Sequence, residues 1–189
     1  MHPVPYKNLI ISIIQNSDVS PELDSAIREG LAECYPEDRD FFSLCRSWHS
    51  EPEWIVYAFT SDGMVAGHTA IIERVVTVGQ DTVPIKVAGI QSVFVRPPWR
   101  KTGLSGRIIE IVLKEARNRD LDAGLLFCLP VLGDKIYGDM GWRKLDAAVF
   151  MKDNSGGRVP LPSKNIAMTI PIIMGEFPTG DIDLCGHDW

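Results

Sequence analysis

The 189-residue chain lacks several features that would settle its class at once. Its longest apolar runs, such as Leu9 to Ile14, fall far short of the ~20 residues that a membrane-spanning helix needs. The N-terminus also lacks the basic region and long apolar stretch of a secretory signal. We therefore expect a cytoplasmic protein that does not associate with membranes.

Cysteine and positive charge are also scarce. The four cysteines show neither Cys-x-x-Cys spacing nor paired histidines nearby, so we expect reduced thiols, with no zinc site and no disulfide framework. The net charge of -6 disfavours nucleic-acid binding, which needs a basic face. The cysteines are Cys34, Cys45, Cys128 and Cys185.

What remains is the composition of an ordinary globular protein, with 45% apolar residues, 23% charged residues and a mean hydropathy near zero. This length predicts a single domain covering residues 1–189. Strand-like and helix-like patterns follow one another in the order β-α-α-β-β-β-α-β-α-β-β, which indicates one mixed α/β (α+β) domain.

Turn and cap residues delimit the expected elements. Ser20 and Pro21 form a helix start, and Asp62-Gly63 is a tight hairpin turn. The expected helices are Pro21 to about Cys34, Pro36 to Trp48, a helix from Gly103 and Asp134 to Met140. The expected strands are Leu9–Gln15, Trp54–Phe59, Val65–Val78, Val83–Val95, Ala123–Leu129, Trp142–Met151 and Ile166–Met174, with a turn at Gly79–Asp81, a loop over Asp153–Pro162 and an irregular tail.

Charge is segregated along the chain. Residues 22–40 hold seven acids and two bases, residues 96–119 hold seven bases and two acids, and the last fourteen residues are acidic again. This distribution suits an anionic ligand bound by the middle of the chain and a cationic ligand bordered by its ends. Solvated helix faces would explain it equally well.

A short loop carries the first resemblance to a known family. After the strand Val83–Val95 and before a helix, the segment Arg100 to Gly106 resembles motif A of GNAT acetyltransferases, Q/R-x-x-G-x-G/A, with Arg100, Gly103 and Ser105 in its fixed positions. A helix N-terminus offers unpaired N–H groups and partial positive charge to a pyrophosphate. The resemblance implies a GNAT fold, with a mostly antiparallel central sheet flanked by helices. It also implies that acetyl-CoA is bound by Val93, Phe94, Val95, Arg100, Lys101, Thr102, Gly103, Leu104, Ser105 and Gly106.

A second segment, Ile136 to Trp142, resembles the GNAT motif B pattern Y-x-x-x-G-F. In that family the tyrosine returns a proton to the departing thiolate, and a phenol with a pKa near 10 can act as such an acid at neutral pH. The resemblance thus implies that Tyr137 is catalytic. Packing of Tyr137 between a short helix and the sheet is the alternative.

Most of the chain, from about Leu23 onward, is similar to aminoglycoside 2'-N-acetyltransferases. That resemblance implies acetylation of an amino group of a cationic aminosugar, the 2'-amine of an aminoglycoside, with antibiotic resistance as the role and kasugamycin-type aminoglycosides among the candidates. In that family a terminal tryptophan carboxylate helps to bind the aminosugar, which Trp189 matches. An acidic rim would attract such a polycation. The acceptor-binding residues are then Glu37, Asp38, Asp40, Asp188 and Trp189.

One position departs from the aminoglycoside enzymes. Gln91 replaces a glutamate that is thought to act there as a base through water, and an amide accepts no proton usefully. The general base must then be another group, and the candidates are His68, Glu73, the terminal carboxylate and a water chain.

The departure also keeps other functions open. Phe177 to Gly180 and the strands around His68 resemble nodulation N-acyltransferases, which acylate a glucosamine end. A protein acetyltransferase and a non-catalytic acetyl-CoA-binding module are further alternatives. GNAT enzymes are frequently homodimers, and the resemblance implies a homodimer for this chain as well.

Overall fold

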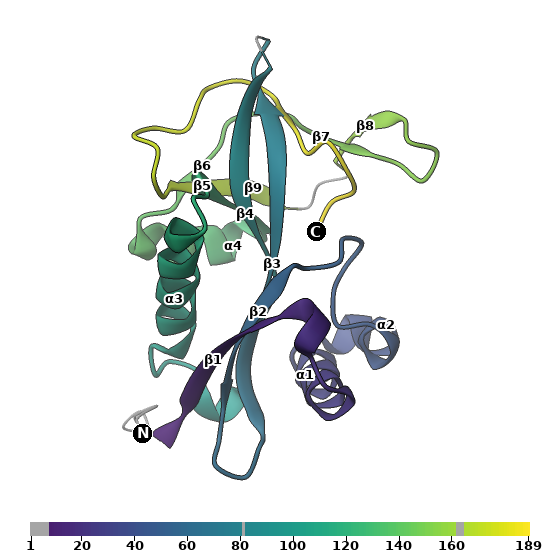
Figure 1. Ribbon diagram of the computed structural model, residues 1–189, viewed down its shortest axis with the longest axis vertical. Coiled ribbons are helices and arrows are strands. Elements are labelled where there is room, and N and C mark those ends of the chain that lie inside the picture. The colour runs from purple at the N-terminus through teal and green to yellow at the C-terminus, as the bar shows by residue number, and fades with distance from the viewer. Residues whose placement is uncertain (1–7, 81, 162–164) are drawn as a thin grey trace. The chain divides into compact units, whose positions relative to one another are not determined.

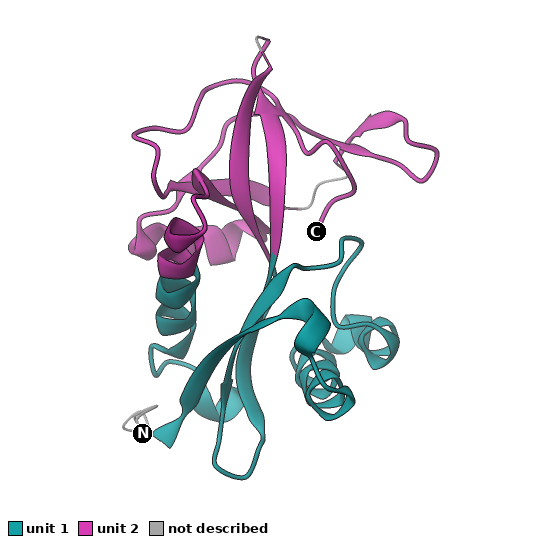
Figure 2. Ribbon diagram, in the orientation of Figure 1, with its two compact units in different colours: residues 1–71, 91–112 teal, residues 72–90, 113–189 magenta. Residues whose placement is uncertain are grey.

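The computed structural model describes residues 8–80, 82–161 and 165–189 (Figure 1). Its contacts divide the chain into two compact units (Figure 2). Unit 1 comprises residues 1–71 and 91–112, and unit 2 comprises residues 72–90 and 113–189. Strands β3 and β4 and helix α3 each contribute residues to both units. The expectation of a single domain over residues 1–189 stays a prediction.

Unit 1 contains an antiparallel set of strands that the sequence placed well. β1 (Ile10–Gln15) pairs with β2 (Trp54–Phe59), and β2 pairs with the first half of β3 (Val65–Val78). β4 (Val83–Val95) adjoins β3, and its second half belongs to this unit. The bounds of β2, β3 and β4 agree with prediction because Gly63 (φ +86°) and Gly79 (φ +74°) allow left-handed turns at their ends.

Two helices cover one face of these strands. In α1 (Pro21–Cys34) the Ser20 hydroxyl accepts a hydrogen bond from the Leu23 amide at 3.3 Å, which confirms the predicted cap. α2 (Arg39–Leu44) is much shorter than the predicted helix Pro36–Trp48. Residues Pro36–Asp38 form a 3₁₀ turn instead. The chain leaves the helix after Leu44 because the Trp48 ring packs back on Phe42, with ring centroids 4.7 Å apart.

The core of unit 1 lies between these helices and the sheet. Its buried members from helices are Ile27, Leu31 and Phe42, and those from strands include Ile55 and Phe94. The first part of α3 (Leu104–Asn118) lies on the other side of the strands (Figure 1). A Cβ added at Gly67 would come within 3.0 Å of the Ile108 side chain, so glycine here permits a close approach of helix to strand.

Unit 2 holds the remaining strands of the mixed sheet, in which the described residues form ten strands, with β1 and β2 off the main path. The strand order along that path is β6-β9-β5-β4-β3-β10-β7-β8, in which β4 with β5 and β10 with β7 are parallel and the other registered pairs are antiparallel. A mostly antiparallel sheet with flanking helices is the predicted fold class. The strands new to this unit are β5 (Ala123–Cys128), β6 (Arg143–Lys144), β7 (Val149–Lys152), β8 (Arg158–Pro160), β9 (Ile166–Pro171) and β10 (Ile182–Asp183).

Several predictions in this half of the chain were wrong in detail. The strand predicted over Trp142–Met151 is broken into β6 and β7, which pair with different partners. The predicted loop Asp153–Pro162 contains β8, with Pro162 outside the described residues, and the predicted tail contains β10. The predicted helix Asp134–Met140 is a chain of short turns: α4 (Pro130–Leu132), a π-helical turn (Gly133–Tyr137) and a 3₁₀ turn (Gly138–Met140).

The core of unit 2 gathers buried side chains from strands and from the end of the chain, among them Val87, Leu125, Ile182 and Trp189. Asp81 of the predicted turn Gly79–Asp81 lies outside the described residues. None of the helices in the described ranges combines the length and the apolar character that crossing a bilayer requires.

Candidate functional site

The predicted pyrophosphate loop lies at a strand-to-helix junction in unit 1. After β4 a 3₁₀ turn (Pro97–Trp99) leads into the loop, where Lys101 (φ +61°) and Gly103 (φ +88°) adopt left-handed conformations. The Thr102 hydroxyl donates to the Trp99 carbonyl at 2.6 Å, and Leu104 anchors the helix start in the core. The first amide N–H groups of α3 follow directly and have no intrahelical partner.

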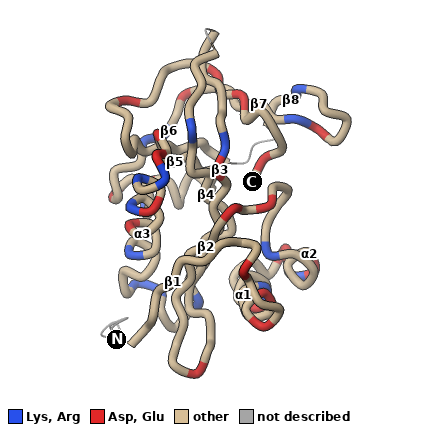
Figure 3. The backbone as a smooth tube through the Cα atoms, viewed as in Figure 1, with Lys and Arg blue, Asp and Glu red and all other residues tan. Residues whose placement is uncertain are grey.

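The charges around this helix start suit an anion. The first turn of α3 contains no acidic residue, whereas the first turn of α1 contains Glu22 and Asp24. Arg100 and Lys101 are exposed, and neither forms an ion pair with any residue in the described ranges. Among the other bases of residues 96–119, Arg96, Arg107 and Arg119 form ion pairs, Arg107 with Glu110 at 3.0 Å. Basic and acidic residues both recur along α3 (Figure 3). The residues present therefore fit a pyrophosphate at the helix start.

The main-chain carbonyls at the end of β4 accept hydrogen bonds from side chains of unit 1. The Tyr35 hydroxyl donates to the Val93 carbonyl at 2.5 Å, and the Arg100 Nε donates to the Val95 carbonyl at 2.9 Å. The Cys34 thiol lies 3.7 Å from the same Val95 oxygen. Arg100 is thus tied to the strand through Nε. The registered pairing of β4 with β5 runs from Val87–Ala123 to Ile90–Leu126.

Phe94, Ser105 and Gly106 complete the predicted cofactor segment. Phe94 is buried in the core, where a Cβ on Gly30 would lie 2.3 Å from its ring, so its side chain is structural. Ser105 and Gly106 lie half-buried in the first turn of α3. Small residues there leave the amide groups of that turn accessible.

The side-chain amide and the main-chain carbonyl of Gln91 all form hydrogen bonds with neighbouring residues. Its side-chain oxygen accepts from the Trp48 amide at 3.0 Å, and its side-chain nitrogen donates to the Ser50 carbonyl at 2.8 Å. Its own carbonyl accepts from the Thr69 hydroxyl at 3.2 Å. Gln91 therefore fastens the irregular segment 45–53 to β4, a role that the sequence did not suggest.

His68 is fully buried and lies next to an irregular point in β4. Its Nδ1 donates to the carbonyl of Ser92 at 3.0 Å, and its ring stacks on Phe94 at 5.7 Å. Burial lowers the pKa of His68 to about 4, partly opposed by the hydrogen bond to Ser92. Nε2 is buried without a hydrogen-bond partner among the described residues, and Ser92 has a left-handed φ of +52°. The ring is neutral at pH 7 and is sealed from solvent.

Tyr137 lies in unit 2, at the last residue of the π-helical turn. It is 8% exposed, and its ring meets Trp142 edge-on at 5.9 Å. Gly141 (φ +87°) reverses the chain between them, which explains the glycine of the motif. The Trp142 ring in turn covers Gly124 of β5, where a Cβ would come within 2.7 Å. Packing thus orients the segment that carries the phenol.

The predicted acceptor residues fall in both units. Glu37, Asp38 and Asp40 of unit 1 lie at the surface around the start of α2, and they form no ion pair with residues in the described part of the chain. In unit 2 Trp189 is 7% exposed and belongs to the hydrophobic core, so the end of the chain is docked. Asp188 beside it is half-buried.

The docking of Trp189 depends on residues that the sequence did not single out. Its ring lies 5.4 Å from Phe127 and 5.3 Å from the Arg74 guanidinium. Arg74 also donates to the carbonyl of His187 at 2.5 Å. A Cβ on Gly89 would lie 2.6 Å from the indole, so only glycine leaves room for it. No sequence signal links these positions, because they come from separate strands.

Glu73, a further candidate base, binds Arg119 through its carboxylate at 3.0 Å. Within the described ranges, no group of three or more side chains has the arrangement of a metal site.

Comparison with known proteins identifies the family. The sequence model described as "Acetyltransferase (GNAT) domain" matches residues 27–145, which include parts of both units. No curated protein sequence matches the chain.

Solved structures show the same fold at low identity. The GNAT family N-acetyltransferase YhbS of Escherichia coli, solved with CoA, is 13% identical with a TM-score of 0.62, covering 94% of this chain and 89% of that one. A GNAT acetyltransferase of Brucella melitensis, solved with acetyl-CoA, is 16% identical with a TM-score of 0.54, covering 92% and 94%. Escherichia coli ElaA is 13% identical with a TM-score of 0.59, covering 85% and 98%. The chain therefore belongs to the GNAT acetyltransferase family, which confirms the predicted fold and the predicted enzyme class, an N-acetyltransferase that uses acetyl-CoA.

Proposed function

We propose that the chain transfers the acetyl group of acetyl-CoA to an amino group of a cationic aminosugar, with an aminoglycoside 2'-amine as the first candidate. The observation that carries the acceptor class is the set of carboxylates at Glu37, Asp38 and Asp40, which no described residue neutralises. Unpaired carboxylates attract a polycation and hydrogen-bond both its ammonium and hydroxyl groups. Trp189 and Asp188 are the second group assigned to the acceptor, by resemblance.

The donor is held by residues of the motif A loop. The amide groups after Gly103 bind the pyrophosphate, and Arg100 and Lys101 add full positive charge. Acetyl-CoA supplies an activated thioester. Tyr137 is the general acid that returns a proton to sulfur as the thiolate leaves.

The base in this proposal is a water chain, because the terminal carboxylate of Trp189 is assigned to the acceptor and the other two candidates are occupied or sealed. His68 is sealed in the core as a neutral ring whose pKa is about 4, so it accepts a proton from an ammonium group poorly. Glu73 is held by Arg119, and both polar ends of the Gln91 amide are occupied. A homodimer, a cytoplasmic location and a role in antibiotic resistance stay predictions.

An assay of CoA thiol release tests the acceptor class. Acetyl-CoA is offered with a panel of aminoglycosides that includes kasugamycin, with N-acetylated analogues as matched controls. Turnover with an aminoglycoside but not with its 2'-N-acetyl derivative is the expected result. Turnover only with glucosamine oligomers and acyl-carrier donors would select a nodulation-like enzyme, and turnover only with basic peptides would select a protein acetyltransferase. Tight acetyl-CoA binding with no turnover of any amine would contradict an enzymatic role.

Substitution of the phenol tests the general acid. Tyr137→Phe keeps the ring against Trp142 and removes only the proton donor, so kcat should fall about 100-fold while the Kd for acetyl-CoA changes little. Tyr57→Phe removes a phenol from β2 of unit 1 and is the control. An unchanged kcat for Tyr137→Phe would refute the role.

A further inference from the structure

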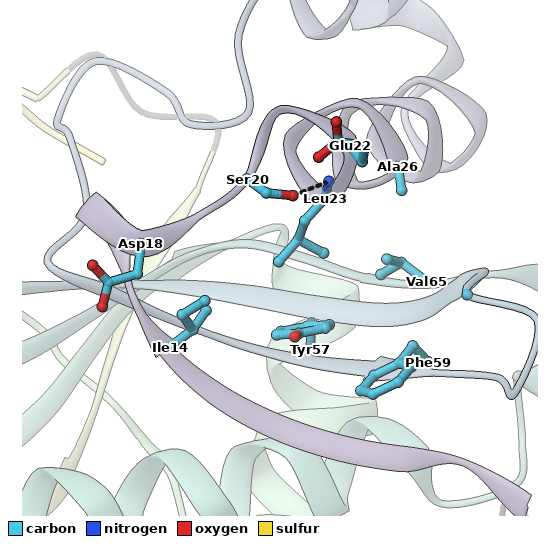
Figure 4. Close-up of a pocket in the computed structure, with 10 residues that line it drawn as sticks. Ile14, Asp18, Ser20, Glu22, Leu23, Ala26, Tyr57, Phe59 and Val65 are labelled. Carbon is cyan, nitrogen blue, oxygen red and sulfur yellow. Dashed lines mark hydrogen bonds between the residues drawn. The ribbon is translucent and has the colours of Figure 1, made fainter.

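A cavity of about 380 Å³ opens in unit 1 between the start of α1 and strands β1 and β2 (Figure 4). Its volume falls in the range of roughly 300 to 1,000 Å³ that small-molecule sites occupy. None of the residues assigned to the acetyl-CoA loop or to the acceptor lines it. The cavity is thus a feature that acetyl transfer does not explain.

One wall of the cavity is aromatic. Tyr57 and Phe59 are two residues apart on β2, so their side chains emerge on the same face of the strand. Their rings stack with centroids 5.4 Å apart and an interplanar angle of 24°. Both remain half-buried, as do Ile14 from β1 and Leu23 from α1, which line the cavity with them. The apolar surface there is incompletely covered by the described residues.

The rim of the cavity is acidic. Asp18 lies at one end beside Ile14, and Glu22 lies at the start of α1 (Figure 4). Neither carboxylate forms an ion pair with a residue in the described ranges, and no basic residue is among those that line the cavity. Hydrogen bonds from its own backbone amide and from Ser20 lower the pKa of Glu22, so this carboxylate is charged at neutral pH.

We propose that this cavity binds a small organic ammonium ion, with the head group against the faces of Tyr57 and Phe59 and its charge balanced by Asp18 and Glu22. A cation over an aromatic face is attracted by the ring quadrupole, and quaternary ammonium groups are recognised in this way. The two carboxylates repel an anion. A neutral ligand would gain contact with the apolar wall and nothing from the rim.

Choline and its uncharged carbon isostere, 3,3-dimethyl-1-butanol, are the probes that test the proposal. Binding to the full chain is followed by NMR in the absence of acetyl-CoA, so the result is independent of acetyl transfer. Choline should bind with a Kd about tenfold lower than that of the alcohol, a difference typical of a cation–aromatic contact reinforced by a charge. The amide signals of Tyr57, Gly63 and Val65 should shift most, because these residues line the cavity.

Charge-neutralising variants locate the site. The double variant Asp18→Asn with Glu22→Gln keeps the shape of the rim and should weaken choline binding about tenfold, with the binding of the alcohol unchanged. Glu29→Gln removes a carboxylate that is on the same helix but does not line the cavity, so it should leave both Kd values unchanged. The three side chains are at the surface, and thermal unfolding verifies that each variant is folded.

Three results would overturn the proposal. Equal affinity for choline and the alcohol would show an apolar cavity without cation recognition. The same weakening in Glu29→Gln as in the double variant would show general charge attraction instead of a site. Absence of saturable choline binding by the unmodified chain would show that the cavity does not bind an ammonium ion.

Discussion

At the scale of single residues, the buried ring of His68 links folding to pH. An exposed histidine in the unfolded chain has a pKa near 6.5, whereas in the fold the pKa of His68 is about 4. The unfolded state therefore binds more protons between these values. The contribution of His68 to the free energy of unfolding is fully present above pH 6.5. It is lost as the pH falls through about 4, and the total loss is about 3 kcal/mol. Urea unfolding at pH 7.5 and 4.5 measures this loss.

A variant without a titrating ring separates His68 from other acid-sensitive groups. Gln at position 68 has an amide that can still donate to the Ser92 carbonyl and takes up no proton in this range. His68→Gln should therefore lose less stability between pH 7.5 and 4.5 than the unmodified chain. An identical loss in both proteins would show that His68 does not cause it.

At the scale of elements, the start of α3 makes a prediction about cofactor affinity. Gly103→Ala adds a Cβ at a left-handed residue and beside the proposed pyrophosphate site, so the KM for acetyl-CoA should rise about tenfold or more. Gly156→Ala is the matched control, because Gly156 has a similar φ of +83° and open space around it, in the turn between β7 and β8. Steady-state kinetics at saturating acceptor compares them.

Equal KM values in the two glycine variants would contradict this assignment of the loop. Both variants should lose a similar stability, about 1 kcal/mol, because both force an L-residue into the left-handed region. Thermal unfolding of each variant therefore separates backbone strain from a loss of cofactor binding.

Local signals explain which elements were predictable. β2, β3 and β4 are long strands bounded by glycine turns, so Gly63 and Gly79 gave their bounds. β10 is two residues long and pairs with strands that are remote in sequence, β3 and β7. β8 is three residues long and pairs with β7 across a short turn, so a loop rich in Gly, Pro and Ser hid it. α2 ends early because Trp48 packs on it, which is a tertiary contact with no local signature.

The residues of the candidate site likewise divide into those with a local sequence signal and those without one. The sequence points to Gly103 and Tyr137 because their motifs are local, a strand-to-helix loop and a tyrosine before a glycine turn, and the roles assigned to them stay predictions. The sequence did not reveal the anchoring role of Gln91, because its partners Trp48 and Ser50 lie more than forty residues away in the chain. Chemical type suggested His68 as a base, but only the structure shows its complete burial.

At the scale of the whole molecule, the end of the chain is a structural part of unit 2. Trp189→Ala removes a buried indole and should cost about 3 to 5 kcal/mol of unfolding free energy. Gly89→Ala should also destabilise, because its Cβ would meet the indole at 2.6 Å. In the double variant the space is open, so the two effects should sum to less than their separate values.

Denaturant unfolding of the four proteins of this cycle measures the coupling. Trp142→Ala replaces Trp189→Ala in the control cycle, because Trp142 packs on Gly124 and not on Gly89. Strictly additive losses for Gly89 and Trp189 would mean that the terminal indole does not occupy this place.

Gln91 also sets a limit on how this chain can be altered. A glutamate in its place would still accept a hydrogen bond from Trp48, but an ionised carboxylate has no proton to give to the Ser50 carbonyl. Two acceptor oxygens would then face each other in a buried setting. Position 91 can hold an ionised carboxylate or can fasten segment 45–53 in this way, and one side chain cannot provide both.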